Sequence, residues 1–177
     1  MALDPPASAR AALAAWREEA FAARDDVRLP DAATLHVTLA FLGYRPEKEI
    51  PLIGELIRTA SELDAAPELS AKEVVPLPPR RPRLFALDLA DPGGSCVALQ
   101  ASISDALEAE RIYKPEKRPF WPHITLARVK RDRIAVLGDV PAPPADAWRG
   151  DAVVLYRSTL RPQGAQYDAL ERVSLSS

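Results

Sequence analysis

The chain has 177 residues, enough to bury a core in one domain or in two packed lobes. Its 23 Lys and Arg residues against 25 Asp and Glu residues exclude a generally basic, nucleic-acid-coating surface. The single cysteine excludes an internal disulfide, and no apolar run reaches the roughly 18 residues that a membrane span needs. Since no charged and then apolar leader opens the chain, we expect a soluble, cytoplasmic protein.

The first half of the chain alternates strand and helix patterns. Residues 2–4 are typical of the end of a strand, and Pro5 then opens a helix that should run to about residue 24. We expect Asp4 to cap this helix, with Pro5 at its first helical position. The other elements predicted for this half are a strand at about 34–42 that ends at Gly43, a helix at about 46–63 and a strand at 68–77.

The second half repeats the first after a proline-rich boundary at about 76–82, and its segment 86–88 (Ala-Leu-Asp) matches residues 2–4. Two β-α-β halves imply a pseudo-twofold single domain over 1–177, with lobes of about 1–78 and 79–177 whose strands meet at a shared cleft. The elements predicted here are a strand at 83–90, a helix at about 96–111 that buries Cys96, a strand at 122–129, an irregular connection at 131–148 and a hairpin of strands 151–160 and 166–175 around a turn at 162–164.

Both histidines of the chain lie in the same motif, His-x-Thr-Leu-Ala, at positions 36 and 123. With the period of a strand, Leu35, Val37, Leu39 and Phe41 face one side of the first copy. The opposite side then carries His36 and Thr38. The second copy places His123 and Thr125 in the same way, so each strand offers an imidazole and a hydroxyl side by side.

Two imidazoles that face one another across a pocket suit displacement at phosphorus. A neutral one takes a proton from the attacking water, and a protonated one gives a proton to the leaving oxygen. Histidine suits both tasks because its ordinary pKa is about 6.5. The hydroxyls of Thr38 and Thr125 would donate to non-bridging phosphate oxygens. The scheme needs neither a metal nor a cofactor.

Other chemistries fit the sequence less well. A zinc site usually needs three or four ligands, and each motif has a threonine where a second ligand on the same face would lie. A serine hydrolase would need a Gly-x-Ser-x-Gly turn, which the chain lacks, and it also lacks the glycine-rich phosphate loops of nucleotide-binding proteins. A single histidine on a strand is commonly structural, but the duplication favours a functional pair.

Residues 111–133 carry eight basic and two acidic side chains, a net charge of +6 in a chain whose total is −2. This window suits a localised anion such as a phosphate, and the alternative is a solvated basic loop. We expect Arg118 and Lys130 to guide an RNA strand. Phe41, Phe120 and Trp121 are candidate stacking surfaces for the terminal base, with core packing as the alternative for each.

The stretches 36–43 and 122–128 resemble the paired motifs of the 2H phosphoesterase superfamily, and specifically of the bacterial and archaeal RNA 2′,3′-cyclic phosphodiesterases, once called 2′-5′ RNA ligases. Residues 155–160 and 164–167 are similar to that family's terminal hairpin. The resemblance implies a bilobal, pseudo-twofold α+β fold, in which two antiparallel sheets flank a central cleft with helices outside. That family usually begins with a longer strand, so we expect the first strand here to be about three residues shorter than its counterpart.

The resemblance also implies an activity, which is metal-independent opening of an RNA 2′,3′-cyclic phosphate to a 2′-phosphomonoester by a monomer. His36 would be the proton donor and His123 the acceptor, with Thr38, Thr125 and Arg128 as phosphate ligands. The expected partners are RNA 2′,3′-cyclic phosphate ends or cyclic nucleotides. The alternatives are another 2H activity, on cyclic phosphate nucleotides or 2′-5′ linkages and including 2′-5′ RNA ligation, and a nucleotide- or RNA-binding module without turnover.

Overall fold

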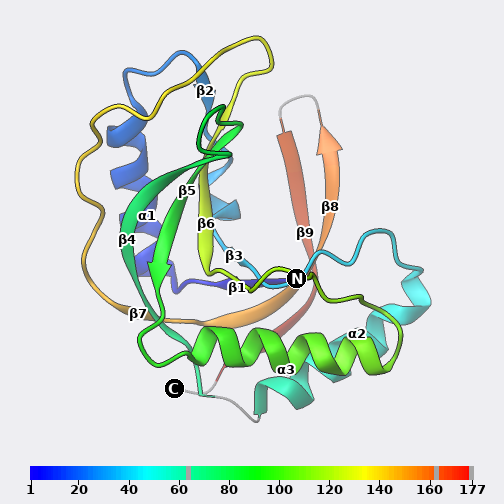
Figure 1. The fold of residues 1–177 in the computed structure, drawn as a ribbon. Coiled ribbons are helices and arrows are strands. Elements are labelled where there is room, and N and C mark those ends of the chain that lie inside the picture. Colours follow the sequence, from blue (N-terminus) through cyan, green and yellow to red (C-terminus); the bar gives the residue numbers. More distant parts are fainter. Residues whose placement is uncertain (63–64, 162–163, 176–177) are drawn as a thin grey trace.

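The computed structural model describes residues 1–62, 65–161 and 164–175, which form a curled antiparallel sheet with helices on its outside (Figure 1). The helices are α1 (Ala7–Phe21), α2 (Ile50–Glu62) and α3 (Ser95–Ala109), and short 3₁₀ turns cover Ala32–Thr34 and Glu47–Glu49. The strands are β1 (Ala2–Asp4), β2 (Val27–Arg28), β3 (Val37–Thr38), β4 (Glu68–Leu77), β5 (Leu84–Ala90), β6 (His123–Val129), β7 (Trp148–Arg149), β8 (Ala152–Arg161) and β9 (Gly164–Ser174).

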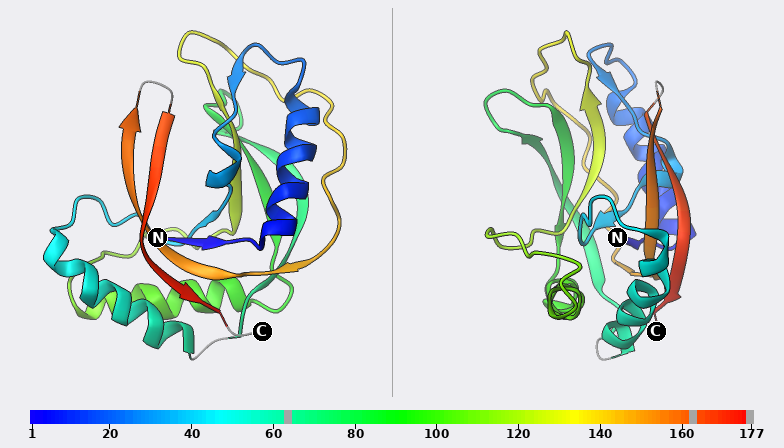
Figure 2. Two further views of the ribbon diagram at one scale, coloured as in Figure 1. Left: turned by 180° about the vertical axis from the view of Figure 1, so that it is seen from behind. Right: turned by 90° about the vertical axis from the view of Figure 1, so that its right-hand side faces the viewer.

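The sheet runs in the order β7-β4-β5-β6-β3-β1-β8-β9, and β2 pairs with β6 beside this path. Its centre is the antiparallel pair β3–β6, so the strands of the two histidine motifs are direct neighbours that join the two halves of the sheet. Each half takes an outer strand from the other half of the sequence, since β4 pairs with β5 and β8 pairs with β1. The sheet curls until the β8–β9 hairpin stands opposite β4–β6 in the side view (Figure 2).

The helices cover the outside of this curl. Helix α1 lies against the part of the sheet that contains β5 (Figure 2). The rings of Phe21 and Phe85 pack there with their centroids 5.8 Å apart. Helices α2 and α3 lie side by side at one end of the sheet (Figure 1). The apolar faces of the central strands are fully buried in the core, at Leu35, Val37, Phe85, Leu87, Ile124 and Leu126. Cys96 is also fully buried, as predicted, and burial raises the pKa of its thiol to about 12.

The predicted order of helices and strands is confirmed, with most ends within a few residues. The first strand is short, as expected, with three residues in β1 against seven in β5. The first histidine strand is shorter than the predicted 34–42, because β3 covers only Val37–Thr38 and a 3₁₀ turn occupies Ala32–Thr34, so His36 lies just before the strand. Gly43, at φ +67°, follows it in the left-handed conformation that glycine adopts readily. Residues 63 and 162–163 of the predicted helix and turn lie outside the described residues.

Two predictions from the first half were wrong. Phe41 does not continue the buried side of its strand, because β3 ends at Thr38, and the Phe41 side chain is 77% exposed. Asp4 does not cap α1, whose N-cap is Pro6 with no side-chain cap hydrogen bond. The Asp4 carboxylate instead turns inward, where three side chains bind it.

Candidate active site

The register of β3 and β6 places four motif side chains at the corners of a square, which we call the histidine square. Its members are His36, Thr38, His123 and Thr125. Val37 lies opposite Ile124, and both point into the core. Continued by one residue in each direction, this antiparallel register puts His36, the residue just before β3, opposite Thr125 and puts Thr38 opposite His123, all on the other face. The two histidines are therefore diagonal neighbours, a relation that separates such residues by roughly 7–8 Å. The pseudo-twofold axis passes between Val37 and Ile124.

A bulge in β6 brings Arg128 onto the same face as this square. Ala86 lies opposite Thr125 and Phe85 opposite Ala127, so Leu126 is an extra residue in β6. Leu126 and Ala127 are consequently both buried, and the alternation restarts with an exposed Arg128. Without the bulge, Arg128 would point into the core. Bulges commonly re-aim a side chain in this way next to a functional site.

His36 lies in an aromatic corner provided by the terminal hairpin. Its ring stacks on Tyr156 at 5.8 Å with an interplanar angle of 21°, and the edge of Tyr167 meets it at 5.4 Å. Burial lowers the pKa of His36 to about 4, although the nearby Asp4 carboxylate opposes this and favours the charged form. His36 is therefore neutral in the free protein near pH 7.

His123 is held by Trp121, two residues before it. The Nδ1 atom of His123 lies 2.8 Å from the backbone oxygen of Trp121, and because a carbonyl oxygen only accepts, Nδ1 carries the hydrogen. A neutral His123 then has its lone pair on Nε2. The indole of Trp121 stacks on the imidazole at 4.4 Å and 15°, and its Nε1 donates to Asp88 at 2.7 Å. Lys72 donates to the same carboxylate at 2.6 Å.

Each histidine thus has a buried aspartate on the neighbouring strand. Asp88 lies opposite His123, and the register of β1 and β3, continued by one residue, puts Asp4 opposite His36. Asp4 accepts hydrogen bonds from Tyr156 and Arg172 and forms an ion pair with Arg10. Burial, with a further contribution from Asp4, raises the pKa of Tyr156 to about 12, so its hydroxyl stays a donor. Sequence reasoning missed this pair, although the repeated Ala-Leu-Asp at 2–4 and 86–88 was its signal.

The remaining predicted RNA contacts are dispersed. Trp121 lies in the square's immediate surroundings, whereas Phe120 is partly buried against the core. Arg118 is exposed and pairs with Glu116 at 2.6 Å, in the segment between α3 and β6. Lys130 lies beyond the other end of β6, about 20 Å from His123 at the usual rise per strand residue. The basic window 111–133 is therefore two separate regions in space.

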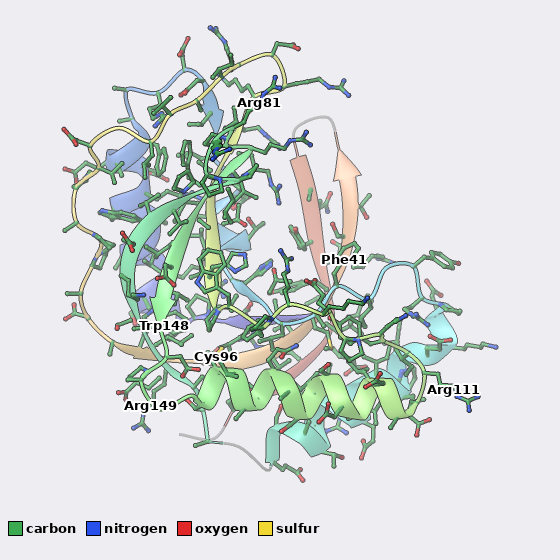
Figure 3. The ribbon with its side chains drawn as sticks, viewed as in Figure 1. Phe41, Arg81, Cys96, Arg111, Trp148 and Arg149 are labelled. Carbon is green, nitrogen blue, oxygen red and sulfur yellow. The ribbon has the colours of Figure 1, made fainter. Side chains whose placement is uncertain are left out.

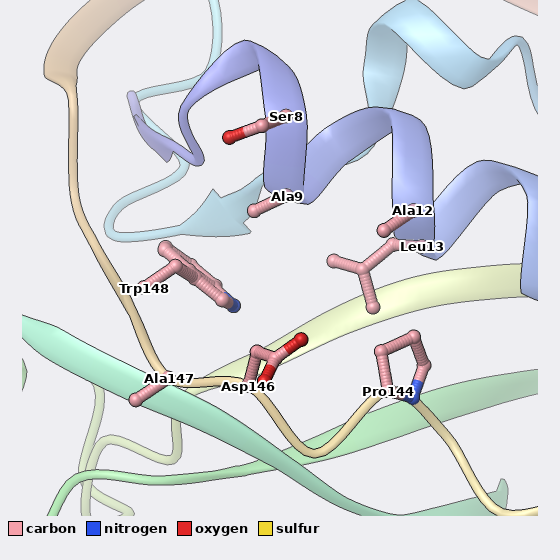
Figure 4. Close-up of a pocket in the computed structure, with 8 residues that line it drawn as sticks. All are labelled: Ser8, Ala9, Ala12, Leu13, Pro144, Asp146, Ala147 and Trp148. Carbon is pink, nitrogen blue, oxygen red and sulfur yellow. The ribbon is translucent and has the colours of Figure 1, made fainter.

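Two hollows lie away from the histidine square. One, of about 190 Å³, is between α1 and the segment 144–148 and is lined by Ala9, Leu13 and Trp148 among others (Figure 4). The other is basic and lies at the end of β6. In the described part of the chain, no three His, Cys, Asp or Glu side chains are grouped as metal ligands. No helix in the same residues is long and apolar enough to cross a membrane.

Known proteins are similar to this chain in sequence and in fold. The family model of the 2′-5′ RNA ligase superfamily matches residues 5–161. The RNA 2′,3′-cyclic phosphodiesterase of Thermus thermophilus is 33% identical over 80% of this chain and 72% of its own, and that of Escherichia coli is 30% identical over 99% and 94%. The crystal structure of the Thermus thermophilus protein TT0787 superposes with a TM-score of 0.80 and 31% identity, covering 98% of this chain and 95% of that one.

The chain belongs to the 2′-5′ RNA ligase superfamily. Its α+β fold is that of the 2H phosphoesterases, as the sequence resemblance implied. The two antiparallel halves expected on either side of a cleft are joined here through β3 and β6 into one sheet.

Proposed function

We propose that this protein hydrolyses RNA 2′,3′-cyclic phosphate ends to 2′-phosphomonoesters, with His36 and His123 as an acid and base pair. The observation that carries the proposal is the square of two imidazoles and two hydroxyls on one face of β3 and β6. Relatives that cover most of the chain and are named RNA 2′,3′-cyclic phosphodiesterases support the substrate class.

In this mechanism, the cyclic phosphate binds over the square. Thr38 and Thr125 donate their hydroxyl hydrogens to the non-bridging oxygens, and Arg128 adds positive charge from the same face. The Nε2 lone pair of His123 takes a proton from a water molecule that attacks phosphorus. The bond from phosphorus to the 3′ oxygen breaks, and protonated His36 gives its proton to that oxygen. The products are a 2′-phosphomonoester and a free 3′-hydroxyl.

The tautomer of His123 supports its role as base, because the bond from Nδ1 to the Trp121 carbonyl leaves Nε2 free to accept. His36 needs the substrate for its role as acid, since burial keeps it neutral in the free protein. A phosphate anion bound beside it stabilises the protonated imidazole. We therefore expect the pH profile of kcat to lie at higher pH than that of kcat/KM, which reports the free protein.

The test is turnover of adenosine 2′,3′-cyclic phosphate in the presence of a chelator, with the monoester products separated by chromatography. We expect the 2′-monoester, and a loss of about a hundred- to ten-thousand-fold in kcat/KM for His36→Ala and for His123→Ala. The double variant should lose less than the product of the two losses, because both groups act on one transition state. Thr59→Val, on the exposed side of α2, is the matched control for Thr38→Val and Thr125→Val.

A nitrophenyl ester assigns the two roles, since its leaving group departs without a proton. It should partly restore the activity of His36→Ala and not that of His123→Ala. Restoration of His123→Ala instead reverses the assignment, and no hydrolysis of any cyclic phosphate or 2′-5′ linkage by the wild-type protein refutes the proposed function.

A further inference from the structure

The end of β6 that is remote from the histidines opens into a hollow of about 370 Å³ with a strongly basic lining. Of the eight described residues that line it, none is acidic and five are cationic, namely Arg81, Arg83, Lys130, Arg131 and Arg133. They come from two segments that are distant in sequence, 81–83 before β5 and 130–133 after β6. Figure 3 shows Arg81 at the end of the molecule opposite to Arg111 and α3.

Most of this charge is not neutralised by the protein itself. Arg133 pairs with Asp25 at 3.2 Å, and Lys130 donates to the backbone oxygen of the same residue at 2.7 Å. Among the described residues, by contrast, no carboxylate lies within ion-pair distance of Arg81, Arg83 or Arg131. In a chain with a net charge of −2, three unpaired guanidinium groups around one hollow favour an anionic ligand.

The hollow also has an apolar wall. Ile134 lines it and is 78% exposed, and Val136, two residues on, is 76% exposed. Large aliphatic side chains are usually buried, so exposure of two of them beside a basic hollow is a feature of a binding surface. Guanidinium groups next to an apolar surface suit a ligand that alternates phosphates with flat, weakly polar bases.

The hollow and the histidine square lie at opposite ends of β6. Both lie on β6, about 20 Å apart by the rise of a strand, with exposed Arg128 between them. A single strand of about four to six nucleotides is long enough to bridge this separation. A mononucleotide in the square would not reach the hollow.

We infer that the hollow binds the sugar-phosphate backbone of an RNA strand a few nucleotides before its cyclic end. The protein is then selective for oligonucleotides over cyclic mononucleotides. This inference rests on the proposed function for the identity of the end that lies in the square, but the binding of RNA in the hollow can be measured separately.

The first experiment measures binding alone, by fluorescence anisotropy of a labelled eight-nucleotide RNA with an ordinary 3′-hydroxyl. Arg81→Glu with Arg131→Glu should weaken binding by about ten-fold or more, and should reduce the slope of log K against log salt by about 1.4, for two phosphate contacts. The matched control is Lys48→Glu with Arg58→Glu, exposed residues of the 47–62 region with the same change of charge. Circular dichroism melting verifies that all variants fold.

The second experiment compares kcat/KM for cyclic-phosphate substrates of one, two, four and eight nucleotides. The wild-type protein and the control variant should favour the longer substrates, with a plateau at about four to six nucleotides. The Arg81→Glu, Arg131→Glu variant should lose this advantage. Unchanged RNA affinity in that variant, or no effect of length in the wild-type protein, overturns the inference. If RNA binds in the hollow but no cyclic phosphate is turned over, the RNA-binding role of the hollow stands and the proposed function is refuted.

Discussion

Replacement of His36 by glutamine should make the protein more resistant to acid. His36 is partly buried in the corner between Tyr156 and Tyr167, and burial holds its pKa near 4 in the folded state against about 6.5 in the unfolded chain. Above pH 6.5 both states are neutral at this residue, so it imposes no pH dependence. Between pH 6.5 and 4 the unfolded state binds a proton that the native state does not, so stability falls as pH falls.

The size of this effect follows from the two pKa values. One proton bound differently costs about 1.4 kcal/mol for each pH unit, so the full loss between pH 6.5 and 4 is about 3 kcal/mol. Below pH 4 both states are protonated, and the loss is complete. Since small domains have total stabilities of about 5–15 kcal/mol, a change of this size is easily measured.

The assay is urea unfolding of the wild-type protein and His36→Gln at half-unit intervals from pH 7.5 to 4. Carboxylates titrate in the same range, but they are common to both proteins, and those that do not interact with His36 cancel in the difference. The difference in unfolding free energy should move by about 3 kcal/mol in favour of His36→Gln as pH falls. Parallel curves, or an NMR titration midpoint of His36 near 6.5, would refute the argument that burial suppresses its charge.

Two further changes test the surroundings of the square. Trp121→Phe keeps a ring over His123 but removes the hydrogen bond to Asp88. We therefore expect a lower kcat with little change in KM, and a free energy of unfolding in urea that is lower by about 1–3 kcal/mol. A change in KM alone would contradict a positioning role. Gly150→Ala would place a Cβ 2.5 Å from Leu3 Cδ1, so it should cost about 1–3 kcal/mol and lower Tm, whereas Gly93→Ala, with open space around it, should not.

The members of the square could be predicted from the sequence because the chain repeats them. Period-two alternation around His36 and His123 also predicted correctly which side chains are buried, as far as Leu39. The antiparallel contact between the two copies could not be predicted, because strand neighbours are fixed by the packing of the whole sheet. The position of Arg128 on the site's face depends on a bulge, which period-two alternation does not include.

The grouping of charged side chains in space was the feature that the sequence predicted least well. Residues 111–133 read as one basic window, but a strand of seven residues separates its two ends in space, and each end meets different partners. Lys130 gathers instead with Arg81 and Arg83, which are almost fifty residues earlier in the chain. The position of Asp4 before two prolines is typical of a helix cap. Its carboxylate instead pairs with Arg10 and accepts hydrogen bonds from Tyr156 and Arg172.

The pseudo-twofold square has a consequence for regiochemistry. A half-turn about the axis between Val37 and Ile124 exchanges the two histidines and the two threonines, so the square alone offers the same groups to a substrate in either orientation. A ribose with its 2′ and 3′ oxygens bridged has no such symmetry. In the proposed reaction, the choice of which ester bond breaks must then come from side chains that the half-turn does not repeat. Trp121 on one side, and the Tyr156 and Tyr167 pair on the other, are the unequal walls that can impose it.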